Sequence, residues 1–136
     1  MAGVRLNTEL KRLRDFHGHL GPYVIVGLKM GKIARGCFGN AGKKLNATVF
    51  TGKKPPLSCI ADGIQFSSGC TLGKGNINVV DKGTAKAVFK KDEEILTITL
   101  KKKIRNEIDK TMTEENELER SLWIYGMDIQ NLFDIS

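Results

Sequence analysis

The chain has 136 residues, of which 40% are hydrophobic and 27% charged, a composition typical of one globular domain, here spanning residues 1–136. No apolar run is long enough to cross a membrane, and the N-terminus lacks the apolar core of a secretory signal, so we expect a cytoplasmic protein. The net charge of +7 comes largely from short lysine runs without interleaved aromatic residues, which makes nucleic acid the least favoured partner.

Two helices are predicted at the N-terminal end. Asn7 is placed to cap a helix over residues 8–15, and Pro22 suits the first turn of a second helix. Gly27 and Gly31 on this second helix would let another backbone approach closely. Its buried face is predicted from residues at helical spacing, namely Tyr23, Val26, Met30, Ile33 and Cys37.

The middle of the chain has the pattern of strands joined by turns. A glycine-rich turn over residues 36–42 precedes an alternating segment at 45–52, and Ser58 is placed to cap a short helix that begins at Cys59. Residues 77–100 predict a β-meander, with turns at 82–83 and 92–93.

One long helix is predicted at the C-terminal end. Thr111 and Glu114 match a capping box, and Gly126 is a weak point in the helix. Its apolar stripe comprises Leu118, Leu122, Tyr125, Ile129 and Leu132, and Trp123 lies beside this stripe, where it would cover a second copy of the chain or another partner. The whole order predicts an α+β fold with one mostly antiparallel sheet packed with helices.

Both histidines of the chain lie in the segment DFHGHLGPY, as His17 and His19. A second segment, CIADGIQFSSGCTLGKGN, offers two thiols and a carboxylate. The sequence has an odd number of cysteines and no secretory signal, which favours free thiols over disulfides. Cys59 falls in the first turn of its helix, where the helix dipole favours thiolate, and Asp62 shares its face.

Several kinds of site remain compatible with these residues. Imidazole together with thiolate suits Zn²⁺, with nickel or iron as the alternatives. A Cys–His nucleophile pair and a solvated turn are the competing interpretations. The segment from Gly69 to Gly75 lacks the spacing of a phosphate loop, although an anion nest using Lys74 stays open.

Taken together, FHGHLGPY, GLKMG and CIADGIQFSSGCTLGKGN resemble the FmdE family of formylmethanofuran dehydrogenase components over roughly residues 10–100. Members show Phe-His-Gly-His-x-Cys-Pro-Gly, then Cys-x-x-Asp-Ala-Ile-Gln, then Gly-Cys-Thr-x-Gly-Lys-Gly-Asn. The resemblance implies an α+β domain, often dimeric, with a metal centre built from these motifs. Some members carry a C-terminal zinc ribbon, which the sequence up to Ser136 does not contain.

The resemblance assigns roles residue by residue. It implies metal ligands at His17, His19, Cys59 and Cys70, with Asp62 in the Cys-x-x-Asp motif and Lys74 and Asn76 as the candidate cofactor-binding residues. Two positions depart from the family pattern, because Gly21 stands where members have cysteine and Tyr23 where they have glycine. The first departure removes a thiol beside the histidines.

The leading hypothesis is a cytoplasmic domain that binds zinc or a similar ion, related to the one-carbon dehydrogenase of methanogenesis as an accessory or stand-alone protein. Whether it is an enzyme is left open; in a catalytic site, His19 or Asp62 would carry the proton. The alternative is a metal-free module for an anionic cofactor, or a structural component with a degenerate site. Expected partners are a second copy of the chain and the other components of a dehydrogenase complex.

Overall fold

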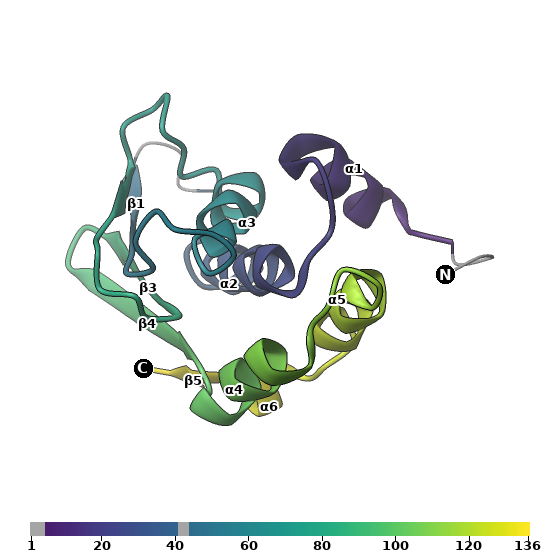
Figure 1. The fold of residues 1–136 in the computed structure, drawn as a ribbon. Coiled ribbons are helices and arrows are strands. Elements are labelled where there is room, and N and C mark those ends of the chain that lie inside the picture. Colours follow the sequence, from purple (N-terminus) through teal and green to yellow (C-terminus); the bar gives the residue numbers. More distant parts are fainter. Residues whose placement is uncertain (1–4, 41–43) are drawn as a thin grey trace.

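A computed structural model describes residues 5–40 and 44–136. The order of its elements is α1 (Thr8–His17), α2 (Pro22–Phe38), β1 (Leu45–Val49), α3 (Cys59–Ser68), β2 (Ile77–Val79), β3 (Lys86–Lys91), β4 (Glu94–Leu100), α4 (Lys102–Thr111), α5 (Glu117–Tyr125), α6 (Ile129–Leu132) and β5 (Phe133–Ile135). In the view of Figure 1 the helices lie to one side of the strands, with α2 and α3 at the centre. The expected α+β class is confirmed.

The five strands form one mixed sheet in the order β2-β1-β3-β4-β5. All neighbouring strands are antiparallel except β1 and β2, which run parallel with Ala47 opposite Ile77. The inner face buries alternate residues of each long strand, among them Leu45, Ala47, Val49, Ala87, Phe89, Ile98 and Leu100. The mostly antiparallel sheet of the prediction is therefore present.

The predicted β-meander is correct only in part. β3 and β4 form the expected hairpin, with Asp92 in the left-handed region at φ 53°. β2 does not pair with β3. It pairs in parallel with β1 instead, on the edge of β1 opposite to β3. Local sequence cannot distinguish these arrangements, since both use the same alternating strands and turns.

The N-terminal helices match the prediction more closely. Asn7 accepts a hydrogen bond from the Leu10 amide at 2.8 Å, and α2 begins at Pro22 as expected. The core face of α2 passes through Ala34 and Phe38, however, and Cys37 is exposed. The predicted turn at 36–42 is wrong at its start because α2 continues through Phe38, and residues 41–43 lie outside the described residues.

Helices α2 and α3 pack so closely that side chains are excluded between their backbones. A β-carbon on Gly27 would overlap the Ile60 carbonyl oxygen, and one on Gly63 would overlap the Val24 carbonyl oxygen. The close approach predicted from Gly27 and Gly31 is therefore confirmed, since a β-carbon on Gly31 would overlap the Ser67 hydroxyl.

The C-terminal region differs most from the prediction. Thr111 ends a helix, α4, which was not predicted from the sequence, and α5 begins only at Glu117. The predicted apolar stripe does not form one helix, because α5 ends at Gly126 and the chain continues into α6 and β5. Trp123 is half-buried, packs against the core and stacks on the Arg120 guanidinium at 4.3 Å. None of the helices in the described ranges is long and apolar enough to span a membrane.

The helix crossing generates a stability prediction. Gly63→Ala should lower the free energy of unfolding by about 3 kcal/mol, because the new methyl group must separate two buried backbones. Gly36→Ala is the matched control in α2, because a β-carbon there meets nothing within 4 Å, and it should be neutral or stabilising by up to about 1 kcal/mol. Urea unfolding of both variants measures the difference, and equal effects would contradict the close crossing.

Candidate functional site

The two histidines face each other across the turn that joins α1 to α2. His17 is the last residue of α1, and Gly18 ends the helix in the left-handed conformation at φ 101°, which a residue without a β-carbon adopts readily. The chain then turns through His19, and the centroids of the two imidazole rings lie 4.7 Å apart. The pair therefore forms one wall of a small site at the start of α2.

His17 is held by Asp62 on α3. Its Nδ1 lies 2.5 Å from an Asp62 carboxylate oxygen. A carboxylate oxygen accepts, so this contact assigns a proton to Nδ1 and leaves Nε2 as the ring nitrogen that faces away from Asp62. His17 Nε2 is buried and has no hydrogen-bond partner among the described residues. A buried polar atom without a partner is costly, so Nε2 is the atom of this site best placed to contact a water molecule or an ion.

His19 is held in the same way by Glu117, the first residue of α5. Its Nδ1 lies 3.0 Å from Glu117 Oε1, and the His19 side chain is 52% exposed. Glu117 was not among the residues predicted from the sequence, and it lies 98 positions further along the chain. No sequence pattern connected this glutamate to the histidines, because only the packing of α5 on α2 brings them together.

Cys59 lines the same site, but its protonation differs from the thiolate that its place in the first turn of a helix predicted. It begins α3 and lines the same small cavity as both histidines. Burial raises the pKa of the Cys59 thiol, and the charges of Asp62 and Glu117 raise it further, while a backbone hydrogen bond opposes them. The thiol form is thus favoured, because desolvation and two carboxylates outweigh the helix terminus. Ser58 makes no side-chain capping bond.

The cavity of this site has a volume of about 20 Å³, enough for a water molecule or an ion rather than an organic ligand. Its lining combines the candidate donors with apolar residues and comprises His17, His19, Gly21, Pro22, Tyr23, Val24, Pro56, Cys59, Met112 and Glu117. In the parts of the chain that the structure describes, no three His, Cys, Asp or Glu side chains are already arranged to hold a metal ion.

The remaining candidates of the second segment lie away from this cavity. Cys70 is buried, donates its thiol hydrogen to the Leu45 carbonyl oxygen at 3.4 Å, and does not line the cavity. Burial raises the pKa of the Cys70 thiol, and the Lys74 charge opposes this effect. Asn76 binds the same Leu45 carbonyl and accepts from the Thr71 amide, so it closes the 71–76 loop.

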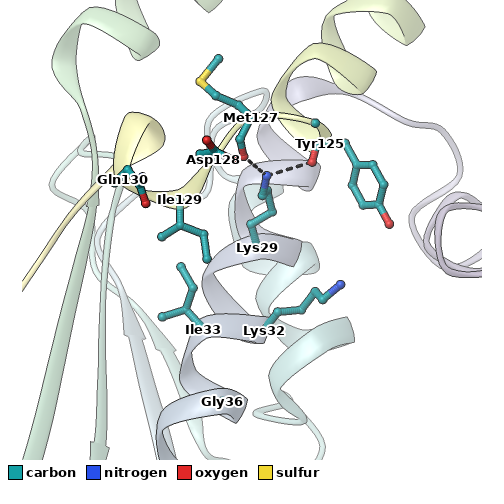
Figure 2. A pocket seen from close by; sticks show the side chains of 10 residues that line it. Lys29, Lys32, Ile33, Gly36, Tyr125, Met127, Asp128, Ile129 and Gln130 are labelled. Carbon is teal, nitrogen blue, oxygen red and sulfur yellow. Dashed lines mark hydrogen bonds between the residues drawn. The ribbon is translucent and has the colours of Figure 1, made fainter.

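A larger groove of about 850 Å³ lies between α2 and residues 125–130 (Figure 2). Lys29 projects into it and donates to the carbonyl oxygens of Ile124, Tyr125 and Met127, at 3.0, 2.9 and 2.5 Å. Three acceptors satisfy all three ammonium hydrogens, so Lys29 caps the C-terminal end of α5. Since Glu117 begins α5, this cap also helps to hold that carboxylate beside His19.

The fold and the paired motifs define an α+β domain in which a His-Gly-His turn faces a helix that begins with Cys-x-x-Asp. The model of the family described as "FmdE, Molybdenum formylmethanofuran dehydrogenase operon" matches residues 16–134, and the chain belongs to this family. The match extends past the expected residue 100 and includes α5, which supplies Glu117.

Two further proteins are similar to parts of the chain. A tungsten formylmethanofuran dehydrogenase FmdE-like protein from Syntrophus aciditrophicus shares the fold, with a TM-score of 0.64 and 19% identity over 93% of this chain and 68% of that one. A probable S-adenosyl-L-methionine-binding protein from Archaeoglobus fulgidus is 33% identical over an alignment of 86 residues, and the match covers 58% of this chain and 22% of that protein. The matched segment is thus a small part of that longer protein.

The electrostatics of Cys59 generate a pH prediction for metal-free protein carrying Cys37→Ser, in which the exposed thiol is removed. Alkylation of Cys59 by iodoacetamide should have its midpoint above the ordinary pKa of a thiol, because burial and two carboxylates disfavour thiolate. Glu117→Gln should move the midpoint to lower pH.

Asp15→Asn is the control for this measurement, since Asp15 is an exposed carboxylate on α1 and should leave the midpoint unchanged. A midpoint in the parent at or below that of free N-acetylcysteine would contradict the assigned environment of Cys59.

Proposed function

We propose that the chain is a cytoplasmic metal-binding domain of the FmdE family, which holds a divalent ion with His17, His19 and Cys59. The observation that carries the proposal is the buried His17 Nε2, a ring nitrogen without a partner among the described residues beside a cavity of ionic size. Zinc is the first choice, with nickel and iron as the alternatives.

The carboxylates behind the histidines support this function. Histidines that bind metals commonly donate their second ring N–H to a carboxylate, which fixes the tautomer and raises the basicity of the ligating nitrogen. Asp62 and Glu117 occupy these positions behind His17 and His19. Asp62 is therefore proposed to position His17. From the sequence alone it was a candidate proton carrier on the same helix face as Cys59.

The donor set fits a borderline-soft divalent ion. Two imidazole nitrogens and one thiolate are typical zinc donors, and three protein donors leave a position for water or substrate. Cation binding would also favour the Cys59 thiolate, which two nearby carboxylates otherwise disfavour. His19 is half-exposed, so an ion can reach its ring from solvent while Nδ1 stays on Glu117. A bound ion would supply Lewis acidity at this position.

Cys70 is not part of the proposed donor set, because it is buried in the core and its thiol donates a hydrogen bond to the Leu45 carbonyl oxygen of β1. The link to one-carbon redox metabolism, as an accessory or stand-alone protein, is supported by the family description and by the name of the structural neighbour. The chain spans about a fifth of the length of the curated relative that it matches, so the metabolic link is a proposal.

Metal uptake tests the function directly. Untagged protein should contain about one ion per chain by elemental analysis, and His17→Ala/His19→Ala should abolish uptake while thermal unfolding stays cooperative. Arg12→Ala/Arg14→Ala on the exposed face of α1 is the control. Stoichiometric metal in the double histidine variant would refute the proposed ligands.

The departure at Gly21 offers a gain-of-affinity test. A β-carbon on Gly21 would lie 3.6 Å from His19 Cε1 and 3.9 Å from Glu117 Cδ, which are ordinary contacts, and φ is −143°, so other residues fit there. Gly21→Cys should tighten zinc binding by about tenfold or more, because it adds a thiolate donor beside His19. Gly21→Ser is the control and should not tighten zinc binding. Competition with a zinc chelator measures both variants, and equal affinities would contradict the placement of the site.

A further inference from the structure

A second, wider cavity opens next to the histidine site. It has a volume of about 460 Å³ and lies between the 51–57 loop, the turn at 81–83 and α4. We call it the Arg105 cleft, and its lining comprises Tyr23, Thr51, Lys54, Pro55, Pro56, Leu57, Asp81, Gly83, Arg105 and Asp109. This volume suits a small organic ligand, unlike the cavity of ionic size beside the histidines.

Arg105 is held in place before any ligand arrives. Its Nη1 donates to the Gly83 carbonyl oxygen at 2.9 Å, and its Nε lies 3.8 Å from Asp109 Oδ2. These contacts use only part of the five-donor guanidinium, which binds carboxylate and phosphate through paired hydrogen bonds. A fixed arginine loses little entropy on binding, so it is well prepared to receive an anion.

The charges around the cleft favour a ligand with a negative group. Asp109 accepts the hydrogen bond of the Tyr23 hydroxyl and lies beside Arg105, so its charge is already engaged. Asp81 and Lys54 both line the cleft, and an adjoining depression adds Lys53. The cationic side chains of the joined surface therefore outnumber its carboxylates.

Tyr23 and Pro56 connect this cleft to the histidine site, since both residues line both cavities. The Tyr23 side chain is almost fully buried and its hydroxyl is fixed on Asp109, so it is a rigid part of the lining of both cavities. Burial and Asp109 raise the pKa of Tyr23, so the hydroxyl stays protonated. A ligand held at Arg105 thus lies next to the proposed metal position.

We propose that the Arg105 cleft binds the carboxylate or phosphate group of a small ligand, whose other end reaches toward the His17–His19–Cys59 cavity. Only the second half of this statement rests on the proposed metal function. The first half concerns anion binding by the domain alone, so the two can fail separately.

The test is an amide NMR titration of the metal-free and the zinc-loaded protein with acetate and with inorganic phosphate, at constant ionic strength. Saturable shifts should appear at residues around Gly83 and Arg105 for at least one of the two anions. Arg105→Gln should weaken that binding by about tenfold or more, because paired charge-assisted hydrogen bonds are lost. Whichever anion binds with the lower Kd identifies the ligand as a carboxylate or a phosphate compound.

Arg12→Gln is the matched control, because Arg12 is an exposed arginine on α1 that lines neither cavity, and it should leave binding unchanged. Lys54 lies on a loop, where a substitution disturbs the fold little. Lys54→Gln therefore supplies the same test if the Arg105→Gln variant does not fold. Absence of saturable binding, or equal binding by the parent and the cleft variants, overturns the proposal. Anion binding in a protein that takes up no metal would support the cleft while refuting the metal site.

Discussion

The backbone contact between α2 and α3 is the constraint on which the rest of the structure depends. Gly27 and Gly63 let two buried helices approach until the carbonyl oxygen of one lies where the other would carry a β-carbon. The first turn of α3 is thereby placed beside the turn that precedes α2. Cys59 and Asp62 reach the histidines for this reason, so the site is a consequence of how the core packs.

The electrostatic character of the site follows from what each histidine contacts. Two carboxylates orient the two imidazoles, and the same carboxylates disfavour a thiolate at Cys59. The cluster therefore combines two carboxylates with a buried ring nitrogen that has no partner among the described residues. In the proposed function, a divalent ion would contact the His17 nitrogen, offset the two carboxylates and favour the Cys59 thiolate. Lys29 contributes from a distance, since it caps α5 and so supports the carboxylate beside His19.

The two departures from the family pattern have different structural consequences. A β-carbon at Gly21 would make only ordinary contacts with His19 and Glu117, so the structure accommodates a larger residue at this position. Tyr23 adds a side chain where members have glycine, and its hydroxyl connects α2 to Asp109 on α4. That contact helps to form the Arg105 cleft, because Tyr23, Arg105 and Asp109 all line it.

The sequence by itself determined the α+β class, the Asn7 cap, the start of α2 at Pro22 and the glycines of the helix crossing, because these depend on local hydrogen bonding and on side-chain size. Through two specific motifs it also singled out His17, His19 and Cys59, which the structure places around one cavity. Only the tertiary structure decided the position of β2, the pairing of Glu117 with His19 and the exposure of Cys37. These depend on contacts between distant segments, whose free energies exceed local preferences and leave no periodic signal in the chain.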